Sequence, residues 1–369
     1  MSYTYQLPKN SKAWQNTLSS LSGKLPSVPT GADFGTDDAY ATLAALPIFA
    51  IIIVSPATES NIDTLIQNWV QSQPNWQLHS LIDDAPAVST HKISSDEALA
   101  DVAIHRYLLA PKTNFAINKD AAAHILDEQI SSHLSAHIHA DVHILSIEKM
   151  LNEHRLACFD MDSTLIEQEV IVELAKFCGV AEKVAEITEQ AMRGEIDFAT
   201  SFARRVALLA EAPIEIVDEI ITKQISFSRG AAATIHALKA LGYHTVLISG
   251  GFEPFAKYVA NTLGIDEYYA NPLISDGKTL TGTIGDTILD GTQKAIITQQ
   301  VAERLGLSPQ QIVCIGDGAN DLPMMNISDI GIAYHAKPIV QAKADAAINT
   351  TGLEGVLYVL GHRLDKCSR

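Results

Sequence analysis

The sequence predicts an α/β protein in two parts: a ferredoxin-like α+β domain, then a Rossmann-like, doubly wound parallel sheet with a helical cap inserted into it. Three observations predict this architecture. The chain has 369 residues, more than a single domain usually holds. Strand and helix patterns in its first part follow the order β-α-β-β-α-β. From Arg155 onward, short apolar runs alternate with helical stretches.

The composition is that of a folded globular protein. Hydrophobic residues make up 47% and charged residues 19% of the chain, which excludes disordered and collagen-like classes. Lys and Arg number 26 against 43 Asp and Glu, and the net charge of −17 repels nucleic acids and anionic lipids. We therefore expect neither nucleic acid nor membrane as a partner. The four cysteines lack CxxC spacing and no signal-peptide pattern is present, so we expect reduced thiols and a cytoplasmic location.

The first domain is expected over residues 43–150, after a polar leader at 1–42 that shows no helical or strand period. Its elements are predicted as strands at 47–54, 76–82, 104–110 and 140–147 and helices at 61–70 and 119–135. This order is that of the ferredoxin-like sandwich. Four histidines are interpreted as solvated side chains rather than a metal site, because no cysteine or carboxylate completes the set: His133, His137, His139 and His143.

The second domain is expected over residues 151–369. Its core strands each end in a polar or Gly-rich turn, and they are predicted at 156–159, 245–248 and 312–315. Ligands of open parallel sheets bind at these carboxyl ends. The segment between the first two strands is too long for one crossover helix, so we place a helical cap at about 171–228. A DG turn within residues 271–291 predicts a short hairpin.

Two carboxylates, Asp160 and Asp162, leave the first core strand in the segment DMDST. Their spacing directs both to the same side of the turn, and two like charges so close need a cation or a shared proton. Mg²⁺ suits hard oxygen ligands and phosphate oxygens. Asp160 can then attack phosphorus, and Asp162 can protonate the leaving alkoxide and later activate water. For this segment alone, a plain surface turn is the alternative.

Two further segments supply phosphate-binding groups. The segment SGG closes the second core strand, where the Ser249 hydroxyl and the Gly250 N–H can donate to phosphoryl oxygens. Lys294, near the start of a helical stretch, supplies a positive charge suited to phosphate. Taken alone, each of these segments has an ordinary structural alternative, a turn or an exposed lysine.

The third core strand ends in the segment GDGAND, which carries two carboxylates and an amide. We expect Asp317 to complete the metal site and Asn320 to reach the phosphoryl group. Asp321 is expected to orient Lys294. The segment lacks the spacing and the distal Glu of an EF-hand loop, which excludes that kind of calcium site.

The motifs DMDST, SGG, Lys294 and GDGANDLPMM, in this order and with a helical insertion after the first, resemble the haloacid dehalogenase (HAD) superfamily and, within it, the phosphoserine phosphatases. The match extends from Leu156 to the C-terminus. The resemblance implies Mg²⁺ held by Asp160, Asp317 and the backbone carbonyl of Asp162. It also implies hydrolysis of phosphoserine through a phosphoaspartate, as the final step of serine biosynthesis.

The residues that recognise the substrate are expected in and near the cap. Glu169 lies nine residues after Asp160, where similar phosphatases place a glutamate against the ammonium group of the substrate. Arg205 matches the arginine that binds the carboxylate, which a guanidinium does with two hydrogen bonds. Met192 and Phe198 would close the apolar side of the pocket. The alternatives are structural: a helix-end charge, a surface charge and ordinary cap core.

The first domain resembles, in element order and position only, the ACT-type regulatory domains attached to some phosphoserine phosphatases. That resemblance implies an amino-acid effector, with serine feedback through a homodimer. Two other functions stay open for the chain: a HAD phosphatase or phosphotransferase that acts on another small phosphomonoester, and a regulatory amino-acid-binding protein with an inactive phosphatase core. The complete set of motif residues argues against the inactive core.

Overall fold

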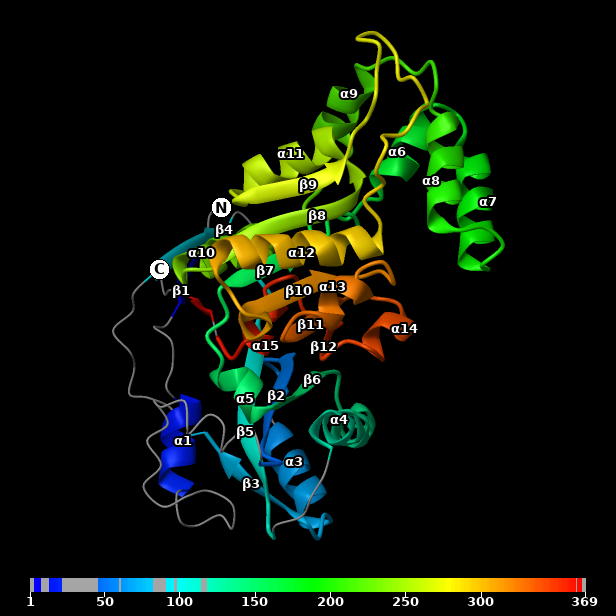
Figure 1. Cartoon of the computed structure of the whole chain (residues 1–369). Helices are drawn as coiled ribbons and strands as arrows, with labels where there is room; N and C mark the ends of the chain where they lie inside the picture. Colours follow the sequence, from blue (N-terminus) through cyan, green and yellow to red (C-terminus); the bar gives the residue numbers. More distant parts are fainter. Residues whose placement is uncertain are drawn as a thin grey trace. The chain divides into compact units, whose positions relative to one another are not determined.

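The computed structural model describes residues 3–7, 13–21, 46–59, 61–81, 91–95, 98–113, 118–362 and 364–366. The chain forms two compact units (Figure 1), one of Met1–Glu153 together with Ala344–Arg369 and one of His154–Lys343. The C-terminal segment, which we expected in the second domain, thus groups with the first unit. Among the described residues, no helix has the length and apolar character needed to cross a membrane.

The first unit contains the predicted ferredoxin-like sandwich. Its antiparallel sheet has the strand order β3-β5-β2-β6, in which the central strand β2 pairs with both β5 and β6. Alternate residues of β2, Phe49, Ile51 and Ile53, join the buried cluster beneath the two helices. The bounds are β2 Phe49–Pro56, α3 Ile62–Gln71, β3 Trp76–Ser80, β5 Val102–Pro111, α4 Lys119–Ser135 and β6 Asp141–Ser146.

The structure differs from the prediction within the first 42 residues, where we expected no regular elements. A strand, β1, pairs antiparallel with β4 and β13, and a helix, α1, buries Trp14 and Leu18. The partners of β1 lie far away in the sequence, so the pairing that makes this segment a strand is not a local feature. The rest of the predicted leader lies outside the described residues. The bounds are β1 Tyr3–Leu7, α1 Ala13–Leu21, β4 His91–Ser95 and β13 Asp365–Lys366.

Asp141, the first residue of β6, binds the C-terminal segment within the first unit. Its carboxylate accepts hydrogen bonds from the backbone N–H of Thr350 at 3.0 Å and from the Thr350 hydroxyl at 2.7 Å.

His143, two residues along β6, is buried, so the prediction that it is solvated is wrong, and burial lowers its pKa. The bounds of the remaining elements are α5 Ile147–Leu151, β12 Ala346–Ile348 and α15 Gly355–Val359.

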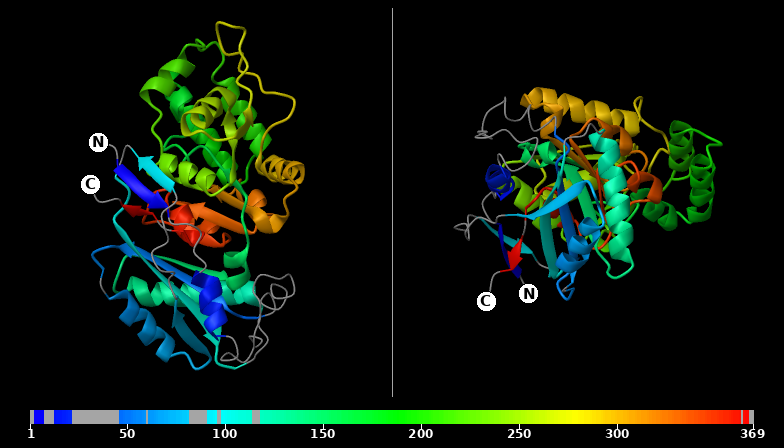
Figure 2. Two further views of the ribbon diagram at one scale, coloured as in Figure 1. Left: turned by 90° about the vertical axis from the view of Figure 1, so that its left-hand side faces the viewer. Right: turned by 90° about the horizontal axis from the view of Figure 1, so that it is seen from below.

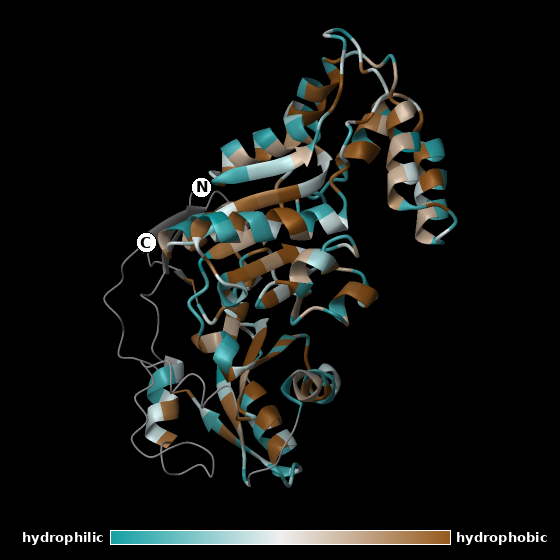
Figure 3. Cartoon of the chain, viewed as in Figure 1, coloured by the Kyte–Doolittle hydropathy of each residue, from teal (hydrophilic) through white to brown (hydrophobic). Residues whose placement is uncertain are grey.

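The second unit is built on a parallel sheet whose strands run in the order β11-β10-β7-β8-β9. Strands β7, β8, β10 and β11 are mostly apolar, whereas the edge strand β9 is largely polar (Figure 3). Helices α10, α11 and α12 all contact β8, and they can be followed by colour in two further views (Figure 2). This is the predicted doubly wound architecture. The strand bounds are β7 Leu156–Phe159, β8 His244–Phe252, β9 Glu267–Asn271, β10 Ile312–Gly316 and β11 Ile330–Tyr334. The helix bounds are α10 Ala231–Ala240, α11 Glu253–Leu263, α12 Gly291–Leu305, η1 Pro309–Gln311, α13 Leu322–Asn326 and α14 Pro338–Gln341.

Four helices lie between β7 and β8 in the segment predicted as a cap. Their bounds are α6 Val170–Phe177, α7 Ala181–Met192, α8 Phe198–Ala207 and α9 Ile216–Lys223. The predicted hairpin after β9 is reduced to a turn closed by one antiparallel bridge, Ser275 to Leu280. Asp276 stabilises this turn by accepting from the backbone N–H groups of Lys278 and Thr279.

Candidate active site

Three parallel strands and one helix bring the predicted residues to one edge of the sheet. Asp160 follows β7, Ser249 lies near the end of β8 and Asp317 follows β10. Because β7 pairs in parallel with both β8 and β10, the carboxyl ends of these strands are adjacent. Lys294, in the first turn of α12, reaches the same place.

A buried ion-pair cluster lies at the centre of the site. The Lys294 ammonium group donates to Asp160 Oδ1 and to Asp321 Oδ1, each at 2.6 Å. Lys294 and Asp321 are completely buried. The second carboxylate oxygen of Asp321 accepts from the Gly318 N–H at 2.9 Å, so both of its oxygens have donors and its orientation is determined.

Negative charge exceeds positive charge in this cluster. Burial, followed by the charge of Asp321, raises the pKa of Asp160 to about 8 despite Lys294. Burial also raises the pKa of Asp317 to about 7 and that of Asp162 well above its usual range. Burial opposes the charge of Lys294, but the neighbouring carboxylates Asp160 and Asp321 outweigh it and raise the Lys294 pKa. The site therefore favours either protons or an added cation.

The carboxylates fit a metal ion. Oxygen atoms of Asp160, Asp317 and Asp321 lie within 4.8 Å of one another, and this is the one such cluster among the residues that the structure describes. Both oxygens of Asp321 accept hydrogen bonds, from Lys294 and from Gly318, whereas Lys294 occupies only one oxygen of Asp160. Asp160 and Asp317 are therefore the members that keep an oxygen able to bind a cation. Two carboxylate ligands and an excess of negative charge suit a hard divalent ion.

The SGG segment forms a bulge against the neighbouring strand β9, with the register shift between Ile248 and Phe252. The Gly251 N–H donates to Ser249 Oγ at 2.8 Å. A Cβ at Gly251 would lie 2.9 Å from Asp162 Oδ2 and 3.0 Å from Ser249 Oγ, so only glycine permits this approach to the Asp162 carboxylate. Bulges of this kind are frequent beside active sites because they redirect side chains.

The structure brings three of the four predicted recognition residues to the site. Arg205, on α8, is half-buried. Burial lowers its pKa, while the charges of Glu169 and Asp162 oppose this shift, so the three groups are near one another. The Phe198 ring lies 3.8 Å from a Cβ placed on Gly250. Met192, at the end of α7, is 66% exposed, and no contact among the described ones joins it to the site.

An aromatic stack joins the cap helix α8 to the end of β8. The ring centroids of Phe198 and Phe202 are 6.0 Å apart and those of Phe202 and Phe252 are 5.7 Å apart. Phe202 and Phe252 are buried. The cap thus packs on the core through the residue that directly follows the SGG segment, which places Arg205, on the same helix, beside the carboxylates.

Sequence analysis missed three residues that support the site. Ser163 donates to Glu169 Oε1 at 3.0 Å, from a left-handed backbone conformation with φ of 57°. Thr164 donates to Asp317 Oδ1 at a longer 3.5 Å. Both lie inside the DMDST segment, so their position was a signal. Asn271, at the end of β9, contacts the SGG segment, and nothing in the local sequence indicated that.

Comparisons with known proteins agree with this geometry. Residues 154–329 match the family model of haloacid dehalogenase-like hydrolases. The chain is 46% identical over 230 residues to a probable phosphoserine phosphatase of Schizosaccharomyces pombe, an alignment that covers 62% of this chain and 77% of that protein. Two further curated phosphoserine phosphatases extend further beyond the matched region, and the chain spans 60% and 55% of their lengths.

Solved structures are similar as well. A structure described as a phospho-aspartyl intermediate analogue of phosphoserine phosphatase is 40% identical, covers 56% of this chain and 98% of its own, and has a TM-score of 0.52. An unliganded probable phosphoserine phosphatase from Vibrio cholerae is 26% identical, covers 97% of this chain and 95% of its own, and has a TM-score of 0.64. The first similarity is confined to about half of the chain, while the second includes both units.

Proposed function

Because the chain belongs to the haloacid dehalogenase-like hydrolases, we propose that it is a phosphoserine phosphatase, which hydrolyses O-phospho-L-serine to L-serine and inorganic phosphate. The observation that carries the proposal is the buried cluster of Asp160, Lys294 and Asp321 at the carboxyl edge of the parallel sheet, with Arg205 and Glu169 beside it. The buried cluster suits a phosphoryl group, whereas Arg205 and Glu169 suit the carboxylate and the ammonium group of an α-amino acid. The reaction would be the final step of serine biosynthesis.

Mg²⁺ is the proposed metal ion, held by Asp160, Asp317 and the backbone carbonyl of Asp162. The excess of carboxylates over ammonium groups supports a cation here. When bound, the ion neutralises phosphoryl oxygens and so lowers the repulsion between an incoming carboxylate and the phosphate.

Asp160 is the proposed nucleophile. Its carboxylate oxygen forms a bond to phosphorus while the bond between phosphorus and the serine oxygen breaks, which leaves a phosphoaspartate. Asp162 gives its proton to the departing serine oxygen, and burial supports this role because it raises the Asp162 pKa and favours the protonated form. The resulting Asp162 carboxylate then takes a proton from the water that attacks phosphorus, which releases phosphate and restores Asp160.

The remaining predicted residues would bind the substrate. Ser249, the Gly250 N–H, Asn320 and Lys294 are proposed to hold the phosphoryl oxygens, where Lys294 contributes a buried positive charge. Glu169 would bind the ammonium group and Arg205 the carboxylate. The aromatic stack that includes Phe198 supports a place for this ring on the apolar side of the pocket. Met192 would reach the pocket only if the end of α7 moved, given its exposure.

Arg205→Ala is expected to raise KM for phosphoserine by about 10- to 100-fold, because a charged hydrogen-bonded pair is lost. KM for phosphoethanolamine, which has no carboxylate, should change little. The measurement is phosphate release from both esters. Arg204→Ala is the matched control, since Arg204 is the next residue on α8 and is exposed. Equal losses with the two esters would contradict the assignment of Arg205 to the carboxylate.

Chelation of divalent ions is expected to abolish phosphate release, and the stabilisation by Mg²⁺ is expected to increase with pH. Asp160 and Asp317 have folded pKa values of about 8 and about 7 against an ordinary value of 3.8. Without metal, between the ordinary pKa and the raised ones, the folded protein therefore holds more protons on these two carboxylates than the unfolded chain does. The contribution of the two carboxylates to the free energy of unfolding falls as pH rises from about 4 to 8. Deprotonated carboxylates bind Mg²⁺.

The measurement is the shift in thermal midpoint on adding Mg²⁺, taken at pH 5, 6, 7 and 8. Comparing the same protein with and without Mg²⁺ at each pH cancels the titration of distant groups. The shift should grow across this series and should be lost in Asp317→Asn. A shift that is constant with pH would contradict a site made of these two carboxylates.

A substrate panel tests the proposed function as a whole. Phosphate release is compared among phosphoserine, phosphothreonine, phosphoethanolamine and sugar phosphates, with Glu169→Ala and Arg205→Ala beside the parent. We expect phosphoserine to be the preferred ester by kcat/KM. Equal values across the panel would support the other open function, a phosphatase for small phosphomonoesters in general. Release of serine without free phosphate, in the presence of an alcohol, would indicate a phosphotransferase.

We further propose that the ferredoxin-like unit binds an amino-acid effector in a homodimer, with serine as the feedback ligand. Its β3-β5-β2-β6 sheet order supports an ACT-like domain. Calorimetric titration of serine and glycine should use the full chain, since residues from Ala344 onward group with this unit. Heat of serine binding that is unchanged in Arg205→Ala, which weakens binding at the active site, would locate the effector outside the active site. The proposed location is the cytoplasm, where Cys158, Cys178 and Cys314 would stay free thiols as they are here.

A further inference from the structure

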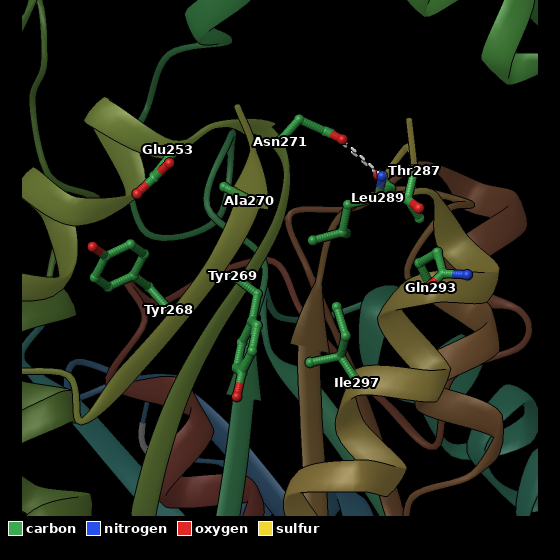
Figure 4. A pocket seen from close by; sticks show the side chains of 9 residues that line it. All are labelled: Glu253, Tyr268, Tyr269, Ala270, Asn271, Thr287, Leu289, Gln293 and Ile297. Carbon is green, nitrogen blue, oxygen red and sulfur yellow. Dashed lines mark hydrogen bonds between the residues drawn. The ribbon is translucent and has the colours of Figure 1, made fainter. Parts of the chain in front are cut away.

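Asn271, the last residue of the edge strand β9, is buried at 3% exposure and makes three hydrogen bonds through its side chain. Its Nδ2 donates to the Gly250 carbonyl at 2.9 Å and, at a longer 3.5 Å, to the Leu289 carbonyl. Its Oδ1 accepts from the Leu289 N–H at 2.7 Å, the bond drawn in Figure 4. The amide therefore connects the SGG segment with the segment that precedes α12.

The bond to Gly250 acts on a peptide unit that Ser249 also contacts. The Gly250 carbonyl and the Gly251 N–H belong to one planar peptide group, and the N–H donates to Ser249 Oγ at 2.8 Å. Because β8 and β9 shift register here, the peptide lies outside the regular ladder. The carbonyl of this peptide accepts a hydrogen bond from Asn271, and its N–H donates one to Ser249.

This arrangement determines what the Ser249 hydroxyl can still do. A hydroxyl has one proton to donate and two lone pairs that accept. Since Ser249 Oγ accepts from Gly251, its proton is available to another acceptor, and no bond from this hydroxyl to a protein acceptor is present among the described ones. Ser249 is completely buried, so an incoming phosphoryl oxygen is the acceptor that the site would provide.

We infer that Asn271 is a positioning residue for phosphoryl transfer: by holding the Gly250–Gly251 peptide, it orients Ser249 toward the phosphoryl group and links that segment to the start of α12, which carries Lys294. The link runs from Leu289 to Asp290, whose carbonyl accepts from the backbone N–H of Lys294 at 2.9 Å. The inference rests on the proposed phosphatase function. It concerns the phosphoryl half of the substrate and not the amino-acid half.

Asparagine is suited to this position because the site needs a donor and an acceptor from one side chain. An ionised aspartate of the same shape keeps the acceptor for the Leu289 N–H but cannot donate to the Gly250 carbonyl. A pocket of about 310 Å³ lies beside Asn271, lined also by Tyr269, Thr287 and Gln293 (Figure 4). A shorter side chain would let water reach the carbonyl from this pocket, which would supply a partner without a defined direction.

The experiment compares Asn271→Asp with the parent enzyme in the presence of Mg²⁺, using phosphoserine and p-nitrophenyl phosphate. The second ester has no ammonium or carboxylate group. We expect kcat to fall by about 10- to 100-fold with both esters, less than the about 100- to 1,000-fold typical of removing a direct donor to the transition state. Affinity for orthovanadate, which mimics the phosphoryl group in transfer, should fall in parallel. Asn261→Asp, on the exposed surface of α11, carries the same charge change as a matched control and should behave as the parent.

A double-mutant cycle with Ser249→Ala tests whether Asn271 acts through Ser249. In the Ser249→Ala background, Asn271→Asp should lower kcat by less than threefold, because the hydroxyl that Asn271 orients is gone. The ratio of kcat for Asn271→Asp to that of the parent should also rise as pH falls, since the new carboxyl group can donate once protonated. If Asn271→Asp gives no folded protein, Asn271→Ala, with water admitted from the pocket, carries the same comparison.

Three outcomes overturn the inference: an unchanged kcat, a loss confined to phosphoserine, or full additivity with Ser249→Ala. These outcomes differ from failure of the proposed function. If the parent itself did not hydrolyse phosphoserine but hydrolysed p-nitrophenyl phosphate, the proposed substrate would be wrong, and the effect of Asn271 on phosphoryl transfer would still be measurable.

Discussion

Asp160→Asn is expected to lower kcat for phosphoserine by about 10,000-fold or more, the scale of loss found when a catalytic nucleophile is removed. The amide has nearly the shape of the carboxylate but cannot form the aspartyl bond to phosphorus. It also removes one of the two carboxylates that hold the Lys294 ammonium group at 2.6 Å. Because Asp160 is buried and its pKa is raised to about 8, we expect folding to be retained or improved.

The measurement is acid-stable incorporation of labelled phosphate from phosphoserine after rapid quenching, together with steady-state phosphate release. The parent should give a labelled protein and Asp160→Asn none. Asp286→Asn is a matched control, since Asp286 is exposed on the segment after β9. If Asp160→Asn kept turnover or became labelled, the nucleophile would have to be another group, and the mechanism proposed here would be abandoned.

Lys294→Met is expected to destabilise the protein by about 3 to 5 kcal/mol, because it leaves buried carboxylates without their counter-charge. Lys294 is completely buried and donates to Asp160 and Asp321 at 2.6 Å. The same change removes the positive charge proposed to bind the phosphoryl group, so activity should be lost as well. Methionine keeps a similar volume, which limits the contribution of a cavity.

Unfolding by denaturant measures the loss of stability. A double variant separates this loss from the loss of activity. Lys294→Met combined with Asp321→Asn removes one unpaired charge and should recover much of the lost stability without recovering activity. Lys223→Met serves as the control, because Lys223 forms an exposed pair with Glu219 and such pairs contribute little. If the double variant recovered activity along with stability, Lys294 would be a structural residue only.

The local motifs could be read from the sequence because each combines an apolar strand with a polar turn at its end. Asp160, Ser249 and Asp317 were predicted in this way, and parallel pairing of β7 with β8 and β10 brings them together. The ferredoxin-like sandwich was predicted because its strand and helix patterns follow the order β-α-β-β-α-β. A helical cap was predicted at about 171–228, and α7, α8 and α9 lie within it.

Long-range pairing was beyond what local patterns could predict. The strand β1 has partners from two distant parts of the chain, β4 and β13, and the segment from Ala344 onward groups with the first unit instead of the second. The predicted hairpin after β9 proved to be a single bridged turn, because an alternating pattern does not determine whether a strand finds enough partners.

The sequence by itself determined the class of fold and the chemistry of the strand ends, because alternation of apolar and polar residues and the identity of acidic, basic and hydroxyl groups are local properties. Tertiary structure alone decided which charged groups form ion pairs and which polar groups form hydrogen bonds. The burial of Lys294 between two carboxylates and the contact of Asn271 with Gly250 both join residues separated by 20 or more positions. Such contacts depend on strand order and on a register shift, which no single segment of the chain specifies.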